Sequence, residues 1–248
     1  MLILLPPSET KARPTRGVPM ELDRLSFPEL TATREQVIAA LIETSAGPDA
    51  MRVLDVPATL GAEVAGNVTL LTRPARPALE IYRGVLYDAL DAPSLSAAGK
   101  RRAGRRLIIS SAVYGAVRPG DRIAPYRTSI DAHLPGVGRL AARWKETLSQ
   151  PLAQAAGSGL IVDARSGPYA ASWRPAGALA SRWVAVRVPG VSHLAKHTRG
   201  LVARALCESP ADPRRPAGLL ALLERDFVVA LHEPPRPGLP WVLEATAR

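Results

Sequence analysis

The stretch Leu107-Ile108-Ile109-Ser110 is a short apolar run that passes at once into a polar, turn-rich segment, Ser111-Ala112-Val113-Tyr114-Gly115. Apolar runs of four to eight residues bounded by turn signals are typical of buried strands. Two similar runs, residues 1–5 and 160–163, lie far away along the chain. We therefore expect three buried strands, and we expect the segment that follows residue 110 to carry ligands, as loops after the strands of open α/β sheets do.

Helical and strand patterns alternate over the rest of the chain. Apolar residues recur at helical spacing in 28–45, where Thr31 or Thr33 is a candidate N-cap, and the sequence also predicts helices over 79–90, 138–155, 193–207 and 216–225. A half-exposed strand is predicted over 183–188, and segments 227–232 and 240–243 are predicted to pair as closing strands. Residues 99–106 are interpreted as a basic loop or a helix end. With no long linker, the pattern predicts an α+β (mixed α/β) fold, in which residues 1–248 form a single compact domain of short strands wrapped by helices.

Composition excludes several classes of protein. A chain of 248 residues with 47% apolar residues can bury a core without disulfides or a structural metal. It contains no apolar run of the roughly 18–20 residues that span a bilayer, so we expect no membrane partner. The opening apolar run lacks a basic flank and ends at Pro6-Pro7, which favours a buried strand over a signal peptide. Cys207 is the only cysteine and is predicted to be a buried structural thiol. Because a single cysteine forms no disulfide within the chain, the cytoplasm is the expected compartment. We expect no cofactor and no metal.

The charge balance indicates an anionic partner. The chain carries 32 Lys and Arg against 22 Asp and Glu, a net charge of +10, which is typical of proteins that bind nucleic acid, nucleotides or anionic surfaces. A GC-rich genome explains the same surplus, because only four of these cations are lysines and scattered arginines suffice. Aromatic residues make up 4% of the chain, so a base-stacking platform for single strands is poorly supported.

Segment 110–127 holds the densest group of candidate functional residues. Arg118, Arg122 and Arg127 present planar guanidinium groups suited to phosphate or carboxylate. Asp121 is the candidate catalytic group, either as a general base or as a residue that orients an arginine. A turn-rich surface loop, in which Asp121 pairs with an arginine for structural reasons, explains the same residues.

Two other segments suggest anion binding. In Ser192-His193-Leu194-Ala195-Lys196-His197-Thr198-Arg199-Gly200, a helix would present His193 with His197 and Lys196 with Arg199 on adjoining faces. Three interpretations of this segment remain: a basic helix face that binds phosphate, a metal site, or a solvated helix face. The second segment, Leu134-Pro135-Gly136-Val137-Gly138, matches the hairpin of helix–hairpin–helix DNA-binding modules, and a Gly-rich helix start explains it equally. P-loop, nucleophile-elbow and zincin motifs are absent from the sequence.

Several segments, taken in order, resemble the YaaA peroxide-stress protein family, in its actinobacterial type. They are residues 4–11, 82–87, 111–127, 161–169 and 196–200. The most specific piece is Tyr114-Gly115-x-x-Arg118-Pro119-x-Asp121-x-x-x-Pro125-Tyr126-Arg127. The resemblance implies a cytosolic bacterial protein of the hydrogen-peroxide stress response that limits iron-dependent damage. It also implies a mixed fold with a basic cleft and a helix–hairpin–helix-like DNA-binding element, which we place near residues 51–67.

By motif matching, the resemblance implies a set of DNA- or anion-binding cleft residues. They are Ser8, Lys11, Arg118, Asp121, Tyr126, Arg127, Lys196 and Arg199. One departure concerns the N-terminal motif: another branch of the family has Pro-Ala-Lys-Thr, whereas this chain has Glu9 in the place of the lysine and a lysine two residues later.

Two functional hypotheses follow. The first is a DNA-binding stress protein whose basic cleft neutralises phosphates of duplex DNA without regard to sequence. The second is an enzyme in which Asp121 acts on a nucleotide, a nucleobase or another small anionic substrate in the same cleft. Direct iron binding, with Asp163, His193 and His197 converging from separate segments, is a weaker third hypothesis.

Overall fold

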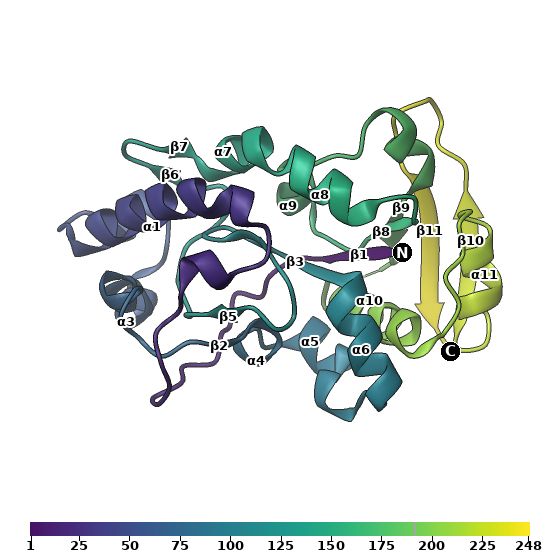
Figure 1. Ribbon diagram of the computed structural model, residues 1–248, viewed down its shortest axis with the longest axis horizontal. Helices are drawn as coiled ribbons and strands as arrows, with labels where there is room; N and C mark the ends of the chain where they lie inside the picture. The colour runs from purple at the N-terminus through teal and green to yellow at the C-terminus, as the bar shows by residue number, and fades with distance from the viewer. Residues whose placement is uncertain (191) are drawn as a thin grey trace.

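A seven-stranded sheet organises the chain in the computed structural model, which describes residues 1–190 and 192–248 (Figure 1). The strands lie in the order β10-β11-β9-β8-β1-β3-β4. Their bounds are β1 Leu2–Leu5, β3 Leu107–Ser111, β4 Gly115–Val117, β8 Ile161–Asp163, β9 Trp183–Arg187, β10 Phe227–His232 and β11 Trp241–Ala247. This confirms the predicted mixed α/β class. The predicted pairing of the last two strands is also confirmed, although β11 runs to Ala247.

The strand order creates a switch point at β1. This strand pairs in parallel with β3 on one side and with β8 on the other, and β9 and β11 continue the parallel set beyond β8. The two edge strands, β4 and β10, are antiparallel to their neighbours. Because the connections leave β1 in opposite directions, a ligand site is expected beside the carboxyl end of β1, as in other open α/β sheets.

Helices lie on both sides of this sheet and beyond its β4 edge. In Figure 1, α7 and α8 lie above β1, α5, α6 and α10 lie below it, and α1 and α3 lie on the left, far from β10 and β11. The α-helices are α1 Thr31–Ala46, α2 Ala50–Val53, α3 Gly61–Ala65, α4 Ala78–Ile81, α5 Val85–Leu90, α6 Ala97–Arg106, α7 Leu140–Thr147, α8 Ser149–Ala156, α9 Gly167–Ala171, α10 Ser192–Glu208 and α11 Gly218–Leu223. Short 3₁₀ turns are η1 Leu22–Arg24, η2 Pro28–Leu30, η3 Ala58–Leu60, η4 Gly66–Thr69, η5 Ala92–Ser94 and η6 Gly177–Arg182. Two small ribbons pair β2 (Arg76–Pro77) with β5 (Arg122–Ile123) and β6 (His133–Leu134) with β7 (Gly138–Arg139).

Two segments predicted as single helices are each broken in two. The predicted helix over 79–90 is interrupted between α4 and α5, where Gly84 has a φ of 102° that helices do not use. The predicted helix over 138–155 starts later, at α7, and breaks at Leu148. Pro151, in the first turn of α8, has no N–H to donate to the carbonyl four residues earlier, so one straight helix is not continuous there.

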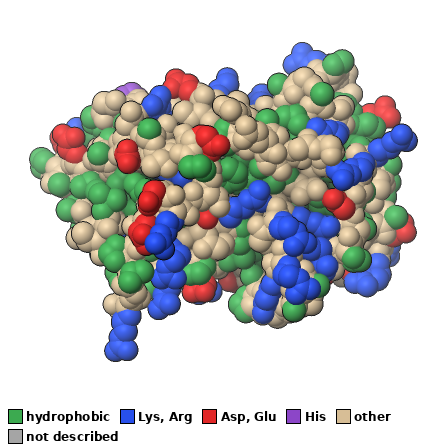
Figure 2. Space-filling model, in the orientation of Figure 1, with side chains coloured by type: hydrophobic (Ala, Val, Ile, Leu, Met, Phe, Trp, Pro, Cys, Tyr) green, Lys and Arg blue, Asp and Glu red, His purple; other side chains and the backbone are tan. Residues whose placement is uncertain are grey.

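The basic segment 99–106 is a helix rather than a loop. Ser96 caps the N-terminus of α6 by accepting a hydrogen bond from the Gly99 N–H. One face of α6 directs Arg102 and Arg106 at backbone carbonyls at and just beyond the C-terminal end of α10. The other face exposes Lys100, Arg101 and Arg105, and Figure 2 shows Lys and Arg side chains gathered over this part of the surface.

Buried apolar side chains form one continuous cluster that runs from Leu2 to Ala245. Cys207 on α10 belongs to it, as predicted, and burial raises the pKa of its thiol to about 12, which keeps it protonated. No helix within the described residues is both long and apolar enough to cross a bilayer. That residues 1–248 form one domain stays a prediction.

Candidate functional site

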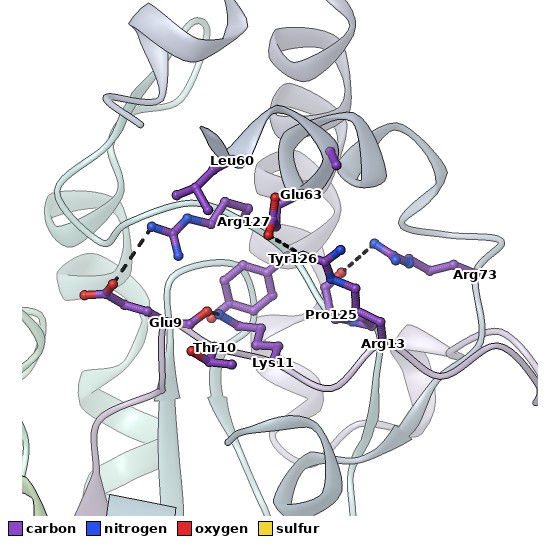
Figure 3. A pocket seen from close by; sticks show the side chains of 11 residues that line it. Glu9, Thr10, Lys11, Arg13, Leu60, Glu63, Arg73, Pro125, Tyr126 and Arg127 are labelled. Carbon is purple, nitrogen blue, oxygen red and sulfur yellow. Dashed lines mark hydrogen bonds and ion pairs between the residues drawn. The ribbon is translucent and has the colours of Figure 1, made fainter. Parts of the chain in front are cut away.

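A pocket of about 290 Å³ opens near the carboxyl ends of β1 and β3 (Figure 3). Its wall combines the loop that follows β1, the short helices η3 and α3, and the segment that returns from β5. Its lining residues are Glu9, Thr10, Lys11, Arg13, Leu60, Ala62, Glu63, Arg73, Pro125, Tyr126 and Arg127. The pocket is attached to β3 by the Tyr126 hydroxyl, which hydrogen-bonds to Ser111 Oγ at 2.8 Å. The pocket therefore lies at the switch point of the sheet.

Lys11 lines this pocket and contacts both backbone carbonyl oxygens and aromatic rings. Its Nζ donates hydrogen bonds to the carbonyl oxygens of Ser8 (2.8 Å) and Glu9 (3.4 Å). The same Nζ lies 4.3 Å from the ring centroid of Tyr126 and 5.7 Å from that of Tyr82. An isolated β-bridge pairs Lys11 with Tyr82, which is where the break between α4 and α5 falls. The extended backbone at that break thus serves to place Tyr82 beside the amine.

The surroundings of Lys11 lower the pKa of its ammonium from 10.5 to about 7. Burial is the main cause, because the charged form loses hydration, and the positive charge of Arg127 adds to it. Glu9 opposes both effects by favouring the charged form. Near neutral pH the Lys11 side chain is therefore partly in its free-amine form.

Replacing Lys11 with Met is expected to stabilise the protein below pH 7 by about 2 kcal/mol. One pKa unit corresponds to about 1.4 kcal/mol, and the lost hydrogen bonds to Ser8 and Glu9 offset part of the lowered pKa. The unfolded chain binds the lysine proton up to about pH 10, whereas the folded protein releases it near pH 7, so the wild-type stability rises between these values. Urea unfolding at pH 6, 8 and 10 should show the advantage of Lys11→Met shrinking as the pH rises.

The control for this prediction is Lys145→Met. Lys145 is exposed on α7, so its amine stays hydrated in the folded protein. We expect its difference from wild type to stay within about 0.5 kcal/mol at every pH. A Lys11→Met difference that is equally small, or that grows with pH, would contradict the lowered pKa of Lys11.

All five tyrosines of the chain lie around this site. The Tyr82 and Tyr87 rings stack at 5.5 Å, the Tyr114 and Tyr126 rings meet edge to face at 5.4 Å, and the hydroxyls of Tyr82 and Tyr126 are 3.4 Å apart. Burial raises the pKa of every one of them, Tyr169 included, and the Tyr126 hydroxyl is close enough to Tyr169 to add to that shift. The tyrosines are therefore neutral, and two of them, Tyr82 and Tyr126, lie directly against the Lys11 amine.

Arginines form the outer part of the pocket. Arg127 Nη2 lies 4.0 Å from a carboxylate oxygen of Glu9, and Arg13 pairs with Glu63 across the mouth. Arg73 donates to the carbonyl oxygens of Gly66 and Pro125, and burial lowers the pKa of its guanidinium. The carboxylates that Arg13 and Arg127 contact belong to half-buried or exposed side chains, so an incoming anion can replace them.

Of the eight predicted cleft residues, the structure brings four together here. Lys11, Tyr126 and Arg127 line the pocket, and Ser8 adjoins it through its carbonyl oxygen. Ser8 also shapes the loop, because its hydroxyl donates to Thr10 O and accepts from the Arg83 N–H. Lys196 and Arg199 lie on α10, where Lys196 is exposed and Arg199 is partly buried with its pKa lowered by desolvation.

Arg118 and Asp121 are not among the described residues that line the pocket. The short strand β4 carries the chain back along β3, so the guanidinium of Arg118 donates to the carbonyl oxygens of Arg105 (2.6 Å) and Leu107 (3.3 Å) near the start of β3. The Asp121 carboxylate accepts hydrogen bonds from Ser26 N–H and Oγ and from the Arg118 N–H. These hydrogen bonds hold the segment that returns from β4 in place, and they leave neither side chain directed at the pocket.

The sequence interpretation missed Arg13, Glu63, Arg73 and Tyr82 as residues of this site. At Arg13, Glu63 and Arg73 the local signal is an isolated charge, and Tyr82 lies within a segment predicted to be a helix. Only Tyr82 lay in a segment that carried the family resemblance, 82–87. A charge-pairing search over long sequence separations would have been needed, since Arg13 and Glu63 are 50 residues apart.

The two segments considered as DNA-binding hairpins have different structures. Residues 134–138 close the β6–β7 ribbon, with φ of 74° at Gly136 and 85° at Gly138, and α7 follows at once. The stretch 124–132 before it is not helical, so a helix–hairpin–helix order is not formed there. Residues 51–67 form two short helices, α2 and α3, joined through η3.

The residues considered for iron do not form a ligand cluster. Asp163 is buried against Arg165, which donates to both of its carboxylate oxygens, whereas His193 and His197 are exposed on α10. Within residues 1–190 and 192–248, no group of three or more His, Cys, Asp and Glu side chains is arranged to hold a metal ion.

Comparison with known proteins identifies the family. Residues 1–229 match the family model described as peroxide stress protein YaaA. The chain is 47% identical over 253 residues to a UPF0246 protein of Streptomyces coelicolor, covering 98% of this chain and 97% of the relative. It is 43% identical over 220 residues to a UPF0246 protein of Corynebacterium efficiens (86% and 87%), and 29% identical over 251 residues to one of Shewanella denitrificans (92% and 91%). The chain therefore belongs to the YaaA peroxide stress protein family.

Proposed function

We propose that the protein acts in the peroxide stress response by binding DNA phosphates at the mouth of this pocket, without reading the base sequence. The observation that carries the proposal is the gathering of Lys11, Arg13, Arg73 and Arg127 around one opening at the switch point of the sheet. A net charge of +10 adds a long-range attraction to any polyanion.

The pocket itself is too small for a duplex. Ligand sites for single small molecules have volumes of about 300–1,000 Å³, and this one has about 290 Å³. Duplex DNA would therefore contact the guanidinium groups at the rim, of which Arg13 is 56% exposed and Arg127 20% exposed. The pocket volume would suit a unit the size of a single nucleotide or sugar phosphate. Neutralised phosphates release their counter-ions. Any ferrous ion held at those phosphates would be displaced with the other counter-ions, and such binding would then limit the iron-dependent damage that peroxide causes at the DNA surface.

The test is a fluorescence-anisotropy titration of a labelled duplex over a salt series. The variant is Arg13→Ala/Arg127→Ala, and the matched control is Arg187→Ala/Arg225→Ala, whose side chains are 66% and 86% exposed far along the chain. Each phosphate contact contributes about −0.9 to the log–log salt slope. We expect a wild-type slope of about −4, a slope shallower by about 2 for the pocket variant, and a smaller change for the control.

Either of two results would count against DNA binding at this site: absence of wild-type binding at low salt, or equal slopes for the two double variants. A basic surface elsewhere, such as the exposed face of α6, would give the second result.

Enzymatic action on a small anionic substrate is the second candidate function. The pocket, not Asp121, favours it, because the Asp121 carboxylate is occupied by Ser26 and Arg118. The ionisable side chains that a small substrate would meet in the pocket include Lys11, Glu9 and Glu63.

A further inference from the structure

Two backbone carbonyl oxygens fix the position of the Lys11 amine. A neutral amine has two N–H donors and one lone pair, and the Ser8 and Glu9 carbonyl oxygens accept hydrogen bonds from Nζ. With both N–H groups engaged on that side, the lone pair is the remaining direction on the nitrogen. The Tyr126 ring, 4.3 Å away, and the Tyr82 ring restrict the amine laterally. Lys11 is also one of the residues that line the pocket.

A lysine acts as a nucleophile only when it is deprotonated, and burial in an apolar setting or a neighbouring cation achieves this. Both conditions hold for Lys11, whose pKa falls to about 7 through burial and the charge of Arg127. The ionisable groups that face it are Glu9, Arg127 and the hydroxyls of Tyr82 and Tyr126. Arg13, Arg73 and Glu63 complete the wall.

The same pocket selects the partner of this amine. An amine nucleophile reacts with a carbonyl carbon, and the arginines at the rim hold a phosphate. A volume of about 290 Å³ accommodates one sugar phosphate. A phosphorylated sugar with a free aldehyde satisfies all three conditions.

We propose that Lys11 forms a Schiff base with the aldehyde of a ring-opened 2-deoxyribose phosphate. The Lys11 nitrogen attacks the aldehyde carbon to give a carbinolamine, and loss of one water from it leaves the imine. No oxidant or reductant is consumed, and the step is reversible by addition of water. The sugar phosphate is either an abasic site within DNA or the free molecule. The DNA source rests on the DNA binding proposed above.

The experiment traps the imine with sodium borohydride, which reduces C=N to a stable secondary amine. Wild-type protein is incubated either with a duplex that contains one abasic site or with free 2-deoxyribose 5-phosphate. Mass spectrometry of the digested protein then locates the adduct. We expect it on Lys11, with at least tenfold less adduct in Lys11→Arg than in Lys145→Arg. The control is matched because each variant has three lysines and the same net charge.

The pH dependence provides an independent readout. The rate of trapping should rise between about pH 6 and 8 and then level off, following the pKa of Lys11. An ordinary lysine would continue to gain reactivity up to about pH 10. Because the adduct site is mapped in the wild-type protein, the proposal stays testable even where Lys11→Arg is poorly folded.

The outcomes separate this inference from the proposed function. Binding of a duplex with a tetrahydrofuran abasic analogue, which has no aldehyde, reports DNA binding alone. If free sugar phosphate gives an adduct at Lys11 but the analogue duplex does not bind, Lys11 is a nucleophile and the sugar phosphate does not come from DNA. Binding of the analogue without adduct from either aldehyde would overturn the inference and leave DNA binding standing. Adduct on the Met1 amine or on other lysines, at equal yield in Lys11→Arg, would also overturn it.

Discussion

Replacing Asp163 with Asn is expected to lower the free energy of unfolding by about 3–5 kcal/mol, the cost of leaving one partner of a buried ion pair without its counter-charge. Asp163 ends β8 beside β1, and its carboxylate receives Arg165 Nε at 2.9 Å and Nη2 at 2.7 Å. The indole N–H of Trp183 donates to the same carboxylate at 3.1 Å. Both charged side chains are almost fully buried, so water cannot replace the lost charge.

The measurement is equilibrium unfolding in urea at neutral pH, compared with Asp91→Asn. Asp91 also pairs with an arginine, Arg204, but at 3.7 Å and with its side chain half exposed. Exposed pairs contribute about 0–1 kcal/mol, so the control should unfold near the wild-type midpoint. Equal midpoints for the two variants would show that the Asp163–Arg165 pair does not stabilise the fold.

Replacing Gly115 with Ala is expected to cost about 3 kcal/mol and to disturb the pocket. Gly115 begins β4 with a φ of 72°, and a Cβ there would lie 2.6 Å from two ring carbons of Trp144. The left-handed backbone costs a residue with a side chain about 1–2 kcal/mol, and overpacking of a core costs a further 1–3 kcal/mol. Trp144 is fully buried and is tied to Ala112 O by its indole N–H, so it cannot move aside cheaply.

Gly136→Ala separates the two contributions to this cost. Gly136 has almost the same φ, 74°, but a Cβ there would meet no atom within 4 Å. Thermal unfolding should therefore show a loss of about 1–2 kcal/mol for Gly136→Ala from backbone strain alone and a clearly larger loss for Gly115→Ala. In Gly115→Ala, the yield of borohydride-trapped adduct at Lys11 should also fall. A displaced Trp144 would shift Ala112, whose N–H donates to the hydroxyl of Tyr126, and the Tyr126 ring packs against Lys11. If the two variants lose the same stability, the Trp144 side chain can move aside without a measurable cost.

Local patterns were sufficient for the main elements of the fold. The apolar runs at 1–5, 107–110 and 160–163 all contain strands, and the helical patterns at 28–45 and 193–207 correspond to the unbroken helices α1 and α10. These predictions succeeded because strand burial and helical periodicity are written within a few neighbouring residues. Boundaries were missed where a single residue acts against the pattern, as Gly84 and Pro151 do.

The candidate site was only half predictable for a topological reason. Arg118 and Arg127 are nine residues apart, yet β4 runs antiparallel to β3, so Arg118 reaches the start of β3 while the chain returns with Arg127 to its end. Sequence proximity therefore suggested a single cluster, and the sheet separates its members. The opposite holds for Lys11 and Tyr82, which are 71 positions apart and paired by a β-bridge.

The sequence by itself determined the mixed α/β class, the buried strands, the family and the presence of a surplus of cations, because each is a property of composition or of short-range order. Only the tertiary structure decided which cations act together and in which ionisation state. The lowered pKa of Lys11 arises from burial and from the charge of Arg127. Lys11, Tyr82 and the adjacent pair Tyr126 and Arg127 come from three distant segments of the chain. Desolvation and charge repulsion depend on distance in space, and a linear sequence does not contain that distance until the chain has folded.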